Sequence, residues 1–119
     1  MPDDVGRVTV IAIADLFGIA AGRTELLALF ADVQRDATTR EGCVRYAFSE
    51  ALDEPDRFTL ISEWRDMAAL EAHYASSAFG RFQHALHGLL ARPSEMTIYR
   101  VSESLRPLPS GPQDPRDAD

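Results

Sequence analysis

Histidine, cysteine and tryptophan are the residues of this sequence best suited to metal binding, acid–base chemistry or ligand stacking, and the chain has three, one and one of them. His84 and His87 have the i, i+3 spacing of metal ligands. On a helix, however, they point away from the apolar residues Phe79, Phe82 and Leu86 and so face solvent. We therefore interpret both as solvated side chains and predict no metal site.

Two other side chains are candidates for a small-molecule site. Trp64 ends an alternating run and precedes a helical one, where a large ring with one N–H can line a pocket as readily as it fills a core. His73 follows on the predicted helix, one position from its apolar stripe, and is either a structural histidine or a pocket histidine. Cys43 is most simply a small buried residue.

The sequence lacks the motifs of most cofactor-dependent and hydrolytic enzymes. It has no Gly-rich phosphate loop, nucleophile elbow, Ser/His/Asp order or paired-carboxylate motif. A single cysteine allows neither an intrachain disulfide nor a CxxC redox or zinc motif. We therefore expect a site without cofactor or metal.

Composition restricts the partners and the location. The chain has 119 residues, of which 45% are hydrophobic, and a formal net charge of -7. This charge repels phosphate groups, so we expect neither nucleic acid nor an anionic membrane surface as a partner. The sequence contains no apolar run of about 18 residues, which argues against a membrane span, and its N-terminus has no signal-peptide pattern. We expect a cytoplasmic protein.

Hydrophobic periodicity predicts the elements that position these residues. Strands are expected at 7–17, 43–50, 57–65 and 95–101, and helices at 23–39, at 67–75 and from about residue 78 to Pro93. The order βαββαβ, with a broken second helix, is typical of a ferredoxin-like α+β domain with an antiparallel four-stranded sheet. We assign this domain to residues 1–103 and a flexible Pro-rich tail to residues 104–119.

The first predicted strand is apolar on both faces. A strand of this kind must be covered on both sides, by helices on one and by something else on the other. We expect a second copy of the chain to cover the face that bears Thr9, Ile11, Ile13 and Phe17. The prediction is therefore a homodimer.

Residues 42–82 resemble the antibiotic biosynthesis monooxygenase (ABM) family, in which a glycine opens the second strand, an E-x-W ends the third and an A-L-E-A-H follows on the helix. Here these are Gly42, the adjacent pair Glu63 and Trp64, and residues 69–73. The resemblance extends over about residues 8–101. It implies a dimeric α/β barrel, in which two sheets pack face to face and each monomer keeps a cavity between its sheet and its helices.

Members of this family differ in activity, and the resemblance implies three functions. The first is cofactor-independent oxidation of a small quinol, phenolic or polyketide-like aromatic substrate by O2. The family's pocket tryptophan matches Trp64, and its asparagine four residues earlier is replaced here by Leu60. We expect Trp64 and His73 to be catalytic, with His73 as a base, and the substrate to contact Tyr46, Phe48, Phe58, Leu60, Ser62, Tyr74, Phe82 and Gln83.

The second implied function is that of a non-catalytic or detoxification-associated protein that binds a small molecule in the same pocket. The replacement at Leu60 favours this alternative. The third is haem degradation, in which the iron-binding histidine follows an S-x-x-F. Matching Ser76 and Phe79 to that motif places Gln83 at the iron site, and glutamine is not a haem ligand.

Overall fold

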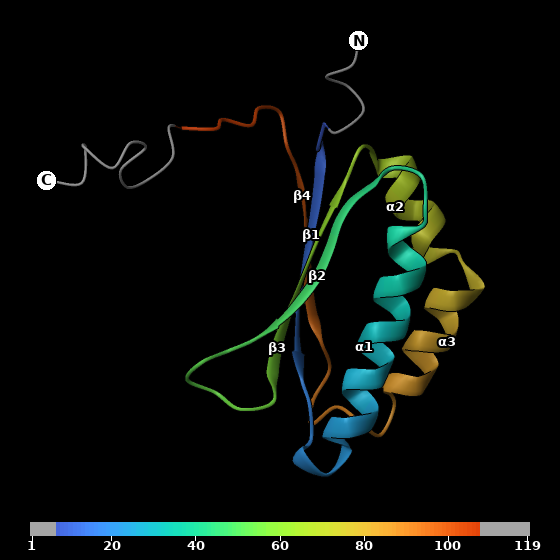
Figure 1. Cartoon of the computed structure of the whole chain (residues 1–119), viewed down its shortest axis with the longest axis vertical. Coiled ribbons are helices and arrows are strands. Elements are labelled where there is room, and N and C mark those ends of the chain that lie inside the picture. Colours follow the sequence, from blue (N-terminus) through green and yellow to red (C-terminus); the bar gives the residue numbers. More distant parts are fainter. Residues whose placement is uncertain (1–6, 108–119) are drawn as a thin grey trace, which may run out of the picture.

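The computed structural model describes residues 7–107, which form a four-stranded antiparallel sheet with helices packed on one of its faces (Figure 1). The strand order across the sheet is β2-β3-β1-β4, so the first and last strands are neighbours. In chain order the elements are β1 (Val10–Phe17), a 3-10 turn η2 (Ala20–Gly22), α1 (Arg23–Thr38), β2 (Cys43–Glu50), β3 (Arg57–Trp64), α2 (Met67–Tyr74), α3 (Ser77–Leu86) and β4 (Glu95–Arg100). This confirms the predicted ferredoxin-like α+β fold.

Alternation along the two central strands determines which face of the sheet carries the helices. Every second residue of β1 and β3 is buried, and the antiparallel register places Leu16 opposite Phe58 and Ala12 opposite Ser62. These side chains therefore share one face, as the period of two requires. They pack against Leu26, Phe30 and other apolar residues of α1 to form the core.

Two of the predicted boundaries were wrong. The first strand begins at Val10 rather than at residue 7, and the last helix ends at Leu86 rather than near Pro93. That helix starts at Ser77 because the Ser76 hydroxyl accepts a hydrogen bond from the Phe79 amide. It ends where Gly88 takes a left-handed conformation with φ of 85°. The ends of the other predicted elements agree within one residue.

The ends of the chain bear on two further predictions. Residues 104–107 of the predicted tail are exposed and have no helix or strand. The rest of that tail, residues 108–119, and residues 1–6 of the predicted domain lie outside the described residues. Within residues 7–107, no helix is long and apolar enough to cross a membrane.

The passage from β3 into α2 depends on a glycine from a distant part of the chain. Gly42 has φ of 86°, and its carbonyl accepts a hydrogen bond of 2.8 Å from the Arg65 amide. A Cβ at this position would lie 2.5 Å from the Ala69 Cβ. The Asp66 side chain then caps α2 by accepting from the Ala69 amide. This arrangement holds α2 close to the start of β2.

The opposite face of the sheet has no helix on it in the described part of the chain (Figure 1). Ile11 and Ile13 of β1 are half-buried there, with Ile61 of β3 directly opposite Ile13. Phe17 is buried on the same face beneath the guanidinium of Arg92, 3.7 Å from the ring centroid. The centre of this face is an apolar surface around two strands.

We expect the protein to form a dimer at micromolar concentration through this face, because contiguous apolar surface of this kind is rare on monomers. Ile61→Arg places a charge at its centre and should give a monomer. Leu27→Arg is the matched control, since Leu27 is exposed on α1, which lies on the other side of the sheet. Light scattering distinguishes the two states, and a monomeric mass for the unaltered protein would contradict the prediction.

Candidate functional site

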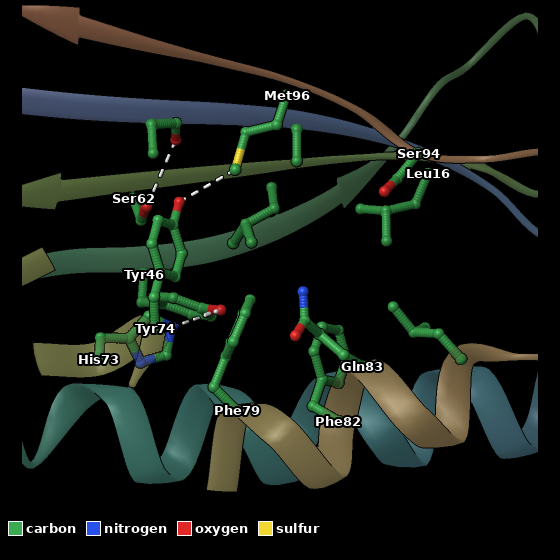
Figure 2. Close-up of a pocket in the computed structure, with 14 residues that line it drawn as sticks. Leu16, Tyr46, Ser62, His73, Tyr74, Phe79, Phe82, Gln83, Ser94 and Met96 are labelled. Atoms are coloured by element: carbon green, nitrogen blue, oxygen red, sulfur yellow. Dashed lines mark hydrogen bonds between the residues drawn. The ribbon is translucent and has the colours of Figure 1, made fainter. Parts of the chain in front are cut away.

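A cavity lies between the helix-covered face of the sheet and the helices α2 and α3 (Figure 2). Its volume is about 90 Å³. Most of its wall is apolar, and the polar side chains that reach it come from β2, β3, the two helices and the chain before β4. The lining residues are Ala12, Ala14, Leu16, Tyr46, Leu60, Ser62, His73, Tyr74, Phe79, Phe82, Gln83, Leu86, Ser94 and Met96.

The structure brings most of the residues expected at the site into this wall. Those that line the cavity are Tyr46, Leu60, Ser62, His73, Tyr74, Phe82 and Gln83. Trp64, Phe48 and Phe58 are not among its lining residues. Phe48 stacks on Phe30 of α1 at 4.0 Å between ring centroids, and Phe58 meets the same ring at 5.1 Å. These two phenylalanines belong to the core under α1.

Trp64 is fully buried, with none of its surface exposed. Its ring stacks on His73 with centroids 5.1 Å apart and an interplanar angle of 28°. His73 therefore stands between the indole and the cavity. The indole Nε1 has no hydrogen-bond partner among residues 7–107. Trp64 supports the polar side chains of the wall without being part of it.

A hydrogen bond between Tyr46 and His73 marks one end of the cavity. The Tyr46 hydroxyl lies 3.3 Å from Nε2 of His73, and Figure 2 shows the two side chains meeting beside Phe79. Tyr46 reaches this place because a bulge between Cys43 and Arg45 breaks the alternation of β2. The same bulge leaves Val44 exposed, whereas strict alternation would have placed it on the buried face with Tyr46.

Burial keeps this pair uncharged at neutral pH. It lowers the pKa of His73 to about 4, because the imidazolium would lose its water, and the nearby cation of Arg40 acts in the same direction while Asp36 opposes it. Burial also raises the pKa of the Tyr46 phenol above its ordinary value. A neutral phenol and a neutral imidazole can donate or accept hydrogen bonds. An imidazole with so low a pKa is a weak base towards a phenolic ligand.

A second polar contact crosses the cavity beside the first. The Tyr74 hydroxyl of α2 donates a hydrogen bond of 2.9 Å to the thioether sulfur of Met96 on β4. Met96 is 51% exposed, so this contact lies where the cavity meets solvent. A cavity of about 150 Å³ holds a benzene ring, so the present volume is too small for one. A ring can therefore enter only if part of this wall moves.

The remaining polar groups of the wall differ in whether they already hydrogen-bond within the protein. The Ser62 hydroxyl donates to the Ala12 carbonyl at 3.3 Å, so its proton is not available to a ligand. Gln83 is exposed on α3, and its amide points toward the middle of the cavity in Figure 2. Ser94 lies at the end opposite Tyr46. Leu60 supplies only apolar surface where the resemblance implied an asparagine.

Seven lining residues were not predicted from the sequence. The periodicity could have identified five of them, and it carries no signal for the other two. Ala12, Ala14 and Leu16 follow from the period of two in the first strand, which places them on the face of Leu60. Phe79 and Leu86 lie on the predicted apolar face of the last helix. Ser94 and Met96 carry no signal in the sequence, because their position depends on β4 pairing with β1 at the edge of the sheet.

His84 and His87 remain outside the cavity. Both are exposed, with ring centroids 6.2 Å apart. Among the described residues, no group of three or more histidine, cysteine and carboxylate side chains could hold a metal ion.

Comparisons with known proteins agree with this fold. Among solved structures, a conserved protein from Methanosarcina mazei has a TM-score of 0.78 at 22% identity, covering 86% of this chain and all of that one. Rv0793 from Mycobacterium tuberculosis has a TM-score of 0.76 at 24% identity, covering 82% of this chain and 98% of that one. A Deinococcus radiodurans protein named as a candidate antibiotic biosynthesis monooxygenase has a TM-score of 0.79 at 24% identity, covering 84% and 99%.

Sequence comparison identifies the family. The uncharacterized protein sll1783 of Synechocystis is 32% identical over 82 residues, which is 69% of this chain. The aligned part spans 56% of that relative, so it matches little more than half of its length. The sequence profile described as antibiotic biosynthesis monooxygenase matches residues 9–85, from the start of β1 nearly to the end of α3. The chain belongs to the antibiotic biosynthesis monooxygenase family.

Proposed function

We propose that the protein is a cofactor-independent monooxygenase that oxidises a small quinol or phenolic compound in this cavity. The observation that carries the proposal is an apolar cavity with a buried Tyr46–His73 hydrogen bond at one end. A flat apolar ring suits the walls made by Leu60, Phe79 and Phe82, while its oxygen meets the polar end. A ring can enter only if the cavity widens from its volume of about 90 Å³, and a single ring needs less widening than a fused polyketide.

Oxidation of a quinol by O2 needs no protein group beyond an apolar cavity with a polar end. An ionised quinol is rich in electrons and passes them to O2, and one oxygen atom ends in the product while the other leaves as water. The protein binds the ring, excludes water and stabilises the anion that forms. In this proposal Tyr46 and His73 face the reacting oxygen, and Trp64 holds His73 in place by stacking on it. The small aromatic substrate and O2 are the partners of the site.

We expect oxygen uptake when the purified protein is mixed with single-ring quinols, at a rate above that without protein. Metal chelation and removal of flavin should leave this rate unchanged, because the electrons come from the substrate. Ala14→Leu should lower the rate to the background, since Ala14 lines the cavity and a larger side chain fills it. Gly80→Ala is the matched control, because a Cβ at Gly80 meets no atom within 4 Å.

A second candidate function is the binding of a small aromatic molecule without oxygen chemistry. Leu60 favours it, because this side chain provides no hydrogen-bond donor at the position where the family commonly has an asparagine. Saturable binding of single-ring phenols with no oxygen uptake from any quinol would establish this function in place of the first. Circular dichroism of each variant confirms that it is folded.

A further inference from the structure

The hydrogen bonds of the buried Tyr46–His73 pair can be arranged in two ways. Tyr46 is 3% exposed and His73 is 1% exposed, so neither can rely on bulk water. Either Nε2–H of His73 donates to the Tyr46 oxygen, or the Tyr46 hydroxyl donates to a bare Nε2. In the second arrangement the imidazole proton is on Nδ1.

The first arrangement is favoured by what surrounds Nδ1. This atom has no hydrogen-bond partner among residues 7–107. A proton on Nδ1 would therefore be a buried N–H without an acceptor, which is rare and costly in folded proteins. A bare lone pair at the same place is tolerated more easily. The imidazole proton accordingly belongs on Nε2, where it is shared with the Tyr46 oxygen.

This arrangement leaves the hydroxyl proton of Tyr46 free. The only hydrogen bond of the hydroxyl within the described residues is the one to His73. Tyr46 lines the cavity, and the nearby Ser62 hydroxyl is already bonded to the Ala12 carbonyl. The O–H of Tyr46 is therefore the available donor at this end of the cavity.

We propose that Tyr46 binds the oxygen of the ligand as a hydrogen-bond donor, and that His73 is a positioning residue that fixes Tyr46 through Nε2–H. The ligand this end selects presents an acceptor oxygen on a single ring, either a phenolate or a ring carbonyl. A neutral phenol can also accept through its oxygen, but a hydrogen bond to a charged acceptor is the stronger one. The inference rests on the proposed function only in that both use the same cavity, and it changes the role of His73 from base to positioning residue.

The other titratable and charged groups near Tyr46 come from three elements. His73 and Tyr74 belong to α2, Cys43 to β2, and Asp36 to the last turn of α1, where Arg40 pairs with it at 3.0 Å. Burial raises the pKa of the Tyr74 phenol and of the Cys43 thiol, so both stay neutral near pH 7. The charges of Asp36 and Arg40 are opposite, so the pair has no net charge. The donated proton of Tyr46 is therefore the main local attraction for a ligand anion.

The test uses 4-nitrophenol without oxygen, because its phenolate absorbs visible light and its neutral form does not. Bound to the unaltered protein, it should show a ratio of phenolate to phenol at least about tenfold higher than when bound to Tyr46→Phe, as a hydrogen bond to a charged acceptor provides. His73→Gln should keep this ratio, because an amide N–H can replace Nε2–H. His73→Leu should lose much of it.

The outcomes separate the possible roles. If His73 were a base, His73→Gln would lose the phenolate as fully as His73→Leu, and the proposal would be overturned. It would also be overturned if Tyr46→Phe left the ratio unchanged or if the unaltered protein did not bind the probe. Because no oxygen is consumed in this assay, the expected result can hold even if every quinol fails in oxygen uptake, in which case only the proposed oxidation is lost. Circular dichroism verifies the folding of each variant.

Discussion

Gly42→Ala should destabilise the protein by about 3 kcal/mol or more, from two additive causes. A left-handed backbone costs a residue with a Cβ about 1–2 kcal/mol, and overpacking a filled space typically costs about 1–3 kcal/mol. At Gly42 φ is 86° and the new Cβ would lie 2.5 Å from the Ala69 Cβ. The backbone cannot easily move away, because the Gly42 carbonyl accepts from the Arg65 amide. A fall in melting temperature of about 12 °C or more should follow.

Two other glycines separate these causes. Gly88 has φ of 85° but its added Cβ meets nothing within 4 Å, so Gly88→Ala should show the backbone cost alone. Gly80 lies within α3 with open space around it, so Gly80→Ala should stabilise by about 0.5–1 kcal/mol through helix propensity. Urea unfolding followed by circular dichroism gives the order of the three variants. Equal losses at Gly42 and Gly88 would show that contact with Ala69 costs nothing.

Acidification should destabilise the protein through His73 by about 3 kcal/mol between pH 6.5 and 4. The imidazole has a pKa of about 4 when folded and an ordinary value of 6.5 when exposed. Between these values the unfolded chain binds more protons than the folded one, so stability falls as pH falls. One pKa unit corresponds to about 1.4 kcal/mol, and the shift is therefore large relative to the stability of a small domain.

His73→Gln isolates this contribution, because glutamine does not titrate. We expect the variant to have a nearly flat free energy of unfolding from pH 6.5 to 4.5 in urea titrations, whatever its absolute stability. Glu50 behaves differently, because hydrogen bonds from Arg23 and the Asp56 amide lower its pKa to about 2. Its contribution is lost between pH 4.5 and 2. Parallel slopes for the variant and the unaltered protein above pH 4.5 would contradict the assignment to His73.

The sequence predicted the sheet well because local periodicity determines which residues of a strand are buried. The alternation of residues 57–64 and the change to a helical period after Asp66 are both present in the structure. The antiparallel four-stranded sheet and the broken second helix were also predicted, and both are present in the structure. The end of α3 did not follow, because the left-handed turn at Gly88 is a local backbone choice without a periodic signal.

The site was predicted less completely. The predicted residues lie on the expected face of the sheet, but some of them are separated from the cavity by other side chains. Trp64 lies on the expected face of β3, but α2 places His73 between the indole and the cavity. Phe48 and Phe58 also face the helices, yet they meet α1 rather than α3. A pattern along one strand cannot tell which helix covers each part of a sheet. The same limitation applies to Met96, which the sequence did not predict. Its place depends on the pairing of β4 with β1, about 80 residues away in the sequence.

The stacking of Trp64 on His73 gives the molecule an optical reporter of its own cavity. Trp64 is the single tryptophan of the chain and is fully shielded from water, and an indole in such surroundings emits at short wavelength. The indole contacts both side chains that bound the polar end of the cavity: His73 stacks on it, and the Tyr46 ring meets it edge to face with centroids 6.4 Å apart. A ligand that alters the bond between Tyr46 and His73 therefore changes the quenching of this fluorophore without touching it. Occupancy of the cavity becomes readable from ultraviolet emission, with no label attached to the protein.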